Sequence, residues 1–131
     1  MTDREQLFTY RLKQAEETLA EAEKMLAGDF SSRTIVNRAY YAVFYATLVL
    51  FLRFEIDCKT SKHAGVISIF DRDVVRSGKM EPRFSRMLHR LFELRQKADY
   101  KELVEIALED AVNAVRHAGE FVAAVREVVA S

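Results

Sequence analysis

The segment AYYAVFYATLVLFL, residues 39–52, decides the fold class, because Thr47 is the only interruption of an otherwise apolar run. A helix that is apolar on nearly every side lies at the centre of a bundle or in an oligomer interface. The β-branched and aromatic residues would also suit a strand, but the run is too long and does not alternate with polar positions. It is shorter than the ~20 residues that a membrane-spanning helix needs. We therefore predict the central helix of a bundle outside the membrane.

The chain on both sides of this segment divides into further helices at capping residues. A Thr-x-x-Glu capping box opens a first helix at Thr2, and Asp29 and Ser31 are candidate N-caps for the central one. Ser61 can cap a third helix, which is expected to break near residues 71–73, and Pro82 suits the first turn of a fourth. The expected helices cover residues 2–28, 29–54, 61–78 and 81–97, with a fifth from Lys101 to Val129.

Composition agrees with one all-α domain. The 131 residues include four Gly and one Pro, which leaves little room for the turns of an all-β fold. Half the residues are apolar and 31% are charged, which argues against disorder. The polar start of the chain, MTDREQ, argues against a signal peptide, so we predict a cytoplasmic protein. We predict a single domain over residues 1–131, an up-and-down bundle of four to five helices.

Charge is balanced over the chain but uneven along it. Lys and Arg equal Asp and Glu in number, so net charge gives no sign of a nucleic-acid partner. Residues 79–101 carry seven Lys or Arg and three Asp or Glu, whereas residues 102–131 carry two and six. A basic segment followed by an acidic one indicates either two helices that pair or one exposed basic face.

The sequence lacks the motifs of several enzyme classes. Cys58 is the only cysteine, and no Cys or His spacing resembles a zinc site. The sequence contains no Gly-rich phosphate loop, no Gly-x-Ser-x-Gly turn and no pair of carboxylates at catalytic spacing. We therefore expect no metal and no cofactor, and we do not expect a nucleotidyltransferase, hydrolase or kinase.

Arg95 falls on the apolar side of the fourth predicted helix. At about 100° per residue it lies among the leucines of that helix, away from the stripe of basic residues that includes Lys97. A guanidinium there must be paired or face a cleft, because burying an unpaired charge is costly. Asp99 is one turn further on and can pair with it, and Tyr100 follows. This pattern suits either an ion pair at a helix end or a cationic site for a phosphate.

Three segments together resemble the HEPN superfamily, with its small stand-alone bacterial and archaeal members the nearest. They are NRAYYAVFYA at 37–46, SKHAGVISIF at 61–70 and FELRQKADY at 92–100. The resemblance covers most of residues 10–125. It implies a bundle of four or five helices that usually forms a homodimer. It also implies, for many members, a minimal nucleotidyltransferase partner in two-component systems that include toxin–antitoxin pairs.

Catalytic members of that family are metal-independent ribonucleases with an Arg followed, after four to six residues, by a His. Arg95 stands at the Arg position, but residues 100–102 are Tyr-Lys-Glu where the His is expected. In some members a tyrosine just after the His is adenylylated by the partner, and Tyr100 is the residue that can correspond to it. Arg83 and His89 satisfy the spacing literally but lie about 120° apart around the helix. The resemblance therefore implies a HEPN domain without the usual nuclease motif.

The predicted nucleotide- or RNA-binding residues are Arg95, Asp99, Tyr100, Lys97, Arg38 and His63. The resemblance commonly places a histidine near residue 63, where a capping or packing role is the alternative. Arg38 is expected to pair with an acidic residue of another helix.

Three functions remain open from the sequence. The first is an RNA- or nucleotide-binding homodimer that works with a nucleotidyltransferase. The second is a divergent metal-independent ribonuclease, in which Arg95 acts with Tyr100, His63 or His89. The third is a structural homo-oligomer in which Arg95 forms a buried ion pair.

Overall fold

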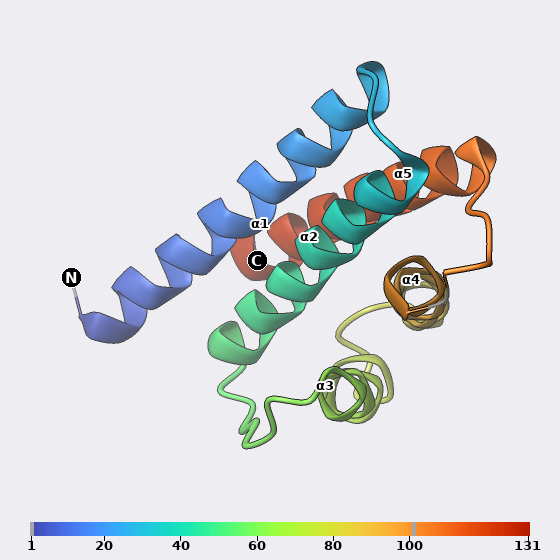
Figure 1. The fold of residues 1–131 in the computed structure, drawn as a ribbon. Coiled ribbons are helices and arrows are strands. Elements are labelled where there is room, and N and C mark those ends of the chain that lie inside the picture. The colour runs from blue at the N-terminus through green and yellow to red at the C-terminus, as the bar shows by residue number, and fades with distance from the viewer. Residues whose placement is uncertain (1, 101) are drawn as a thin grey trace.

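Helices form the framework of the protein in the computed structural model, which describes residues 2–100 and 102–131. In chain order they are α1 (Asp3–Ala27), α2 (Ser32–Arg53), α3 (His63–Phe70), the π-helix η1 (Asp71–Val75), α4 (Pro82–Tyr100) and α5 (Leu108–Ala130). The long helices α1, α2 and α5 lie side by side, and α3 and α4 are seen end-on beside them (Figure 1). The predicted all-α bundle is confirmed.

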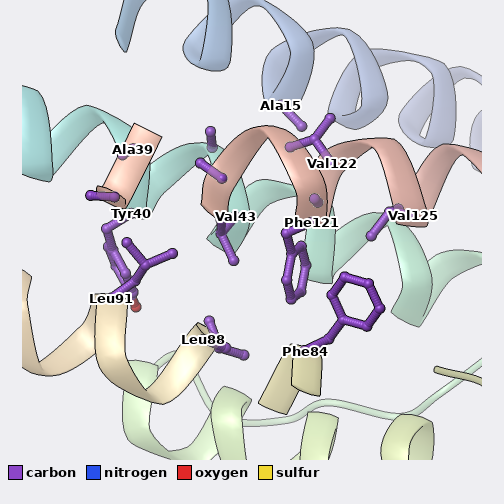
Figure 2. Packing of buried hydrophobic residues seen from close by; sticks show 14 of the residues in the cluster. Ala15, Ala39, Tyr40, Val43, Phe84, Leu88, Leu91, Phe121, Val122 and Val125 are labelled. Carbon is purple, nitrogen blue, oxygen red and sulfur yellow. The ribbon is translucent and has the colours of Figure 1, made fainter. Parts of the chain in front are cut away.

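Helix α2 lies at the centre of the bundle and contacts α1, α4 and α5. Tyr40 and Val43 of α2 point toward the layer of α4 that holds Leu88 and Leu91, and Phe121 of α5 lies beside them (Figure 2). By length and apolar content α2 also qualifies as a membrane span, but 61% of its most apolar window is buried inside the bundle. A core helix of a soluble protein passes the same test, and burial on several sides gives α2 this role.

The predicted caps Thr2 and Ser31 are confirmed, whereas the candidates Asp29 and Ser61 are not the caps. Thr2 Oγ1 accepts a hydrogen bond from the Glu5 amide, and Ser31 Oγ accepts one from the Thr34 amide. Ser61 does not cap α3, because Lys62 is the N-cap residue and has no side-chain capping bond. The expected break near residues 71–73 is instead the wider turn of η1, which continues α3 without a gap.

The boundary between α4 and α5 also differs from the prediction. Helix α4 continues to Tyr100 rather than ending near Lys97, and α5 begins at Leu108. The predicted start of α5, Lys101, lies outside the described residues, and residues 102–107 are not helical. Arg33 of α2 explains this, because its guanidinium donates to the main-chain oxygens of Ala98 and Val104 and so binds the end of α4 and the following connection.

Candidate functional site

The side chain of Arg95 lies between α4 and α2 and is only 12% exposed. Its Nε donates to Asp99 Oδ2 at 2.8 Å, and its Nη2 donates to the Tyr41 hydroxyl at 3.1 Å. The ion pair spans four residues, which places both side chains on one face of α4. The structure thus brings Arg95 to the apolar side of its helix and pairs it there, as its position in the sequence predicts.

Three tyrosine rings surround the guanidinium of Arg95. Its Cζ lies 5.4 Å from the ring centroid of Tyr40, 5.5 Å from that of Tyr41 and 5.6 Å from that of Tyr100. At these distances the rings attract the cation. Tyr40 is fully buried, whereas Tyr100 is 70% exposed. We call Arg95, Asp99, Tyr41 and Tyr100 the Arg95 cluster.

One edge of the Arg95 guanidinium is open. Within residues 2–100 and 102–131, Nη1 of Arg95 makes no hydrogen bond. The one buried side-chain polar atom without a partner in these residues is Nε of Arg11, so Nη1 is not such an atom. Nη1 is therefore not fully buried, and both of its N–H groups lack a partner among the described residues. A guanidinium held rigidly by its other nitrogens, with one edge free, is suited to binding a phosphate or carboxylate.

Asp99 accepts a second donor in addition to Arg95. The Nδ2 of Asn37 lies 3.4 Å and 3.3 Å from the two carboxylate oxygens of Asp99. Arg38 in turn donates to Asn37 Oδ1, from Nε at 3.3 Å and from Nη2 at 3.1 Å, and its Cζ lies 5.3 Å from the Tyr41 ring centroid. The predicted ion pair of Arg38 with an acidic residue is not observed in the described part of the chain. Arg38 instead reaches Asp99 through Asn37.

His63, at the start of α3, lies on the same aromatic surface as Arg95. Its ring stacks on Phe44 with centroids 4.1 Å apart, and its Nδ1 lies 2.7 Å from the Tyr40 hydroxyl. Burial raises the pKa of Tyr40, although Arg95 lowers it and Tyr41 raises it further. Burial also lowers the pKa of His63, and the charge of Arg95 lowers it again.

These contacts fix the tautomer of neutral His63. The Tyr40 side chain is fully buried, and within the described residues its hydroxyl has no acceptor other than Nδ1. A buried hydroxyl donates to whatever acceptor is available, so Tyr40 donates to Nδ1 and the ring proton of His63 sits on Nε2. Nε2 has no hydrogen bond to any residue that the structure describes, and it is not fully buried. Of the capping or packing role given as the alternative, His63 has the packing one, because its ring stacks on Phe44 while Lys62 is the N-cap residue.

Lys97 is the one predicted site residue that the structure leaves apart from the others. Residues that are two positions apart in a helix lie about 200° apart around its axis, so the side chains of Arg95 and Lys97 point to opposite sides of α4. Lys97 is exposed, and its main-chain oxygen accepts a hydrogen bond from Arg33 at 3.3 Å.

Three residues at the site were not among the predicted binding residues: Asn37, Tyr40 and Tyr41. They share one face of α2 at spacings of three and four residues. The segment NRAYYAVF carries this spacing, so the shared face was visible in the sequence. The sequence did not show which neighbouring helix that face contacts, because the rest of α2 is nearly as apolar.

A second polar cluster lies at the other end of α4, away from Arg95. Asp71 of η1 accepts a hydrogen bond from Ser85 Oγ at 2.6 Å, and its other oxygen lies 2.5 Å from His89 Nε2. We call these three residues the Asp71 cluster. Arg83 instead pairs with Glu120 at 3.5 Å. The Arg83 and His89 side chains thus have separate partners, in agreement with the interpretation of their spacing as chance.

The all-helical bundle is the fold that the resemblance to the HEPN superfamily implies. Comparison of the sequence with protein families gives the same result, because the HEPN domain family matches residues 8–128. The chain belongs to the HEPN family.

Three relatives illustrate this membership. A UPF0332 protein of Thermotoga maritima is 33% identical over 129 residues, which are 98% of this chain and 96% of that protein. The protein named "Putative toxin MJ0142" of Methanocaldococcus jannaschii is 30% identical over 100 residues, 76% of this chain and 66% of that protein. "Putative toxin MJ0605" of the same organism is 41% identical over 86 residues, 66% of this chain and 62% of that protein.

Proposed function

We propose that this chain is a HEPN module that binds RNA or a nucleotide at the Arg95 cluster. The observation that carries this proposal is the free edge of Arg95, whose Nη1 is not fully buried and has no hydrogen bond among the described residues, while Asp99 and Tyr41 hold the other nitrogens. Two free N–H groups can bind a phosphate. The exposed ring of Tyr100, directly beside the guanidinium, offers a surface on which a base can stack.

We further propose that the module works in the cytoplasm with a minimal nucleotidyltransferase, in a two-component, toxin–antitoxin-like system. The names of the two archaeal relatives support a toxin-related role. A homodimer is also part of the proposal, because α2 leaves a row of large apolar side chains only half covered. These residues are Tyr41, Phe44, Tyr45, Leu48 and Leu52. A second copy that covers this row would bring two Arg95 clusters close together.

The test is the affinity for a fluorescent single-stranded RNA, measured by anisotropy with wild type, Arg95→Ala and Arg86→Ala. Arg86 is exposed on the same helix and has no hydrogen bond or ion pair among the described residues, so its variant controls for general loss of charge. We expect Arg95→Ala to weaken binding by about tenfold or more, and Arg86→Ala by about twofold or less. Equal losses in the two variants would show that RNA binds the basic surface of α4 rather than the cluster.

A ribonuclease is the second candidate, and one observation favours it. His63 and Arg95 flank the same pair of rings, those of Tyr40 and Tyr41, and Nε2 of neutral His63 is not fully buried and has no hydrogen bond among the described residues. A histidine beside a phosphate-binding arginine can move protons near neutral pH. Cleavage of RNA by the pure protein with EDTA present, lost in His63→Gln, would support this activity. The absence of cleavage at high protein concentration would leave the binding module.

A further inference from the structure

The connection between α4 and α5 carries an exposed apolar surface next to the Arg95 cluster. Leu103 is 100% exposed, Leu108 is 64% exposed and Val112 is 43% exposed. Leu108 and Val112 are one turn apart on α5 and share its outer face. Single exposed apolar residues are common, but several within ten residues mark a site of interaction.

This connection is held in place rather than loose. Arg33 donates to the main-chain oxygens of Ala98 and Val104, so α2 fixes both the end of α4 and the connection. Val104 and Ile106 are half-buried, whereas the residues between and before them are exposed. Main-chain hydrogen bonds from a charged group are among the strong ones. An exposed leucine on an ordered segment loses little conformational entropy when a partner covers it.

The charges around the apolar residues restrict what can cover them. Glu102, Glu105 and Glu109 are exposed within the same segment, and the next basic residue after position 101 is Arg116. A surface of this charge repels the phosphates of RNA and of anionic lipids. It complements a protein surface with an apolar recess bordered by Lys and Arg. We call Leu103, Leu108, Val112 and these three glutamates the 102–112 surface.

We propose that the 102–112 surface docks the partner nucleotidyltransferase, through an apolar recess that Lys and Arg border on that partner. This inference rests on the proposed function. The position of the surface gives the contact a consequence. Tyr100, which lies against Arg95, immediately precedes the connection and is 70% exposed. A protein docked there would lie beside the exposed ring of Tyr100, and we expect it to compete with RNA for that ring.

The experiment measures binding of the purified chain to a purified minimal nucleotidyltransferase from the same host, by titration calorimetry. Leu103→Ser/Leu108→Ser tests the apolar part, and Leu7→Ser, an exposed leucine of α1, is the matched control. We expect the double variant to weaken binding by about tenfold or more and Leu7→Ser by about twofold or less. Glu105→Lys/Glu109→Lys tests the charge, and its effect should shrink as salt screens it.

The outcomes separate this inference from the proposed function. Wild-type binding to the nucleotidyltransferase with no loss in either double variant overturns the docking surface and leaves the partnership intact. A wild-type chain that does not bind the enzyme overturns both the docking surface and the partnership, while RNA binding through Arg95 is judged separately by Arg95→Ala. If Leu103→Ser/Leu108→Ser instead lowers RNA affinity as Arg95→Ala does, or changes only the sedimentation of the free chain, the surface belongs to RNA or to a second copy and the inference is wrong.

Discussion

The two polar clusters of α4 are built from similar parts but differ in whether they are complete. In each, one carboxylate accepts two donors from other residues. In the Asp71 cluster the donors are Ser85 and His89, each on its own carboxylate oxygen, and the contacts fasten α4 to η1. In the Arg95 cluster the donors to Asp99 are Asn37 and Arg95, and the guanidinium keeps further N–H groups free.

This difference indicates which cluster supports structure and which supports binding. Hydrogen bonds that pair every donor with a carboxylate oxygen contribute stability and leave none of those donors for an anionic ligand. A cation that is fixed on one edge and free on the other is already oriented for an anion before that anion arrives. The Arg95 cluster has this second arrangement, and exposed Tyr100 borders it. The Asp71 cluster has the first.

The largest expected difference between the clusters is in the cost of losing the carboxylate. Asp99→Ala leaves Arg95, whose side chain is 12% exposed, without its counter-charge, and we expect a loss of about 2 kcal/mol in the free energy of unfolding. Asp71→Ala leaves His89 without its carboxylate partner. Because the His89 side chain is 49% exposed, water can replace that partner, and the free energy of unfolding should fall by about 1 kcal/mol. Urea unfolding measures both values. Equal losses would contradict the distinction between a desolvated cation and hydrated partners.

A smaller effect is expected from Tyr40→Phe, which removes the hydroxyl bound to His63 Nδ1. Loss of this buried hydrogen bond should cost about 1 kcal/mol, and His63 should no longer be held in the Nε2–H tautomer. Nitrogen NMR of the imidazole reports the tautomer directly. Ser85→Ala is the counterpart in the Asp71 cluster, and its cost should be similar while the His63 spectrum stays unchanged. An unchanged His63 spectrum in Tyr40→Phe would rule out the assigned role of Tyr40.

The helices were largely predictable because their signals are local. The apolar run at residues 39–52 predicted the central helix, and Ser31, which caps it, was one of the two candidates for its start. The start of α5 was not predictable, because residues 102–107 contain good helix formers. Their conformation accompanies a contact with Arg33, which lies more than sixty residues away in the chain. A contact of that kind leaves no pattern in the segment that it shapes.

The candidate site was predictable to the same extent. The periodicity of α4 placed Arg95 on the apolar side, and the four-residue spacing predicted its pair with Asp99. The partners on α2 were not identified, because a helix that is apolar all round has no preferred direction in its sequence. His63 was noted through resemblance alone, and its contact with Tyr40 joins two helices whose packing no local pattern determines.

The smallest expected effect is a dependence of stability on pH. The pKa of His63 is lower in the folded protein than its usual 6.5, first through burial and then through Arg95. Between those two pKa values the unfolded chain binds more protons than the folded one. The contribution of His63 to stability is therefore full above about pH 6.5 and is lost as the pH falls through the folded pKa.

Urea unfolding of wild type and His63→Gln, between about pH 7.5 and pH 5, measures this contribution. The free energy of unfolding of wild type should fall more steeply toward acid than that of the variant. His117→Gln is an independent comparison, because burial and then Arg116 also lower the pKa of His117, which is far from the Arg95 cluster in the sequence. Each single variant should reduce the dependence of the free energy of unfolding on pH. The reduction in the double variant should equal the sum of the two single reductions. A slope in His63→Gln equal to that of wild type would mean that the pKa of His63 is the same in the folded and unfolded chain, and therefore that burial and Arg95 do not lower it.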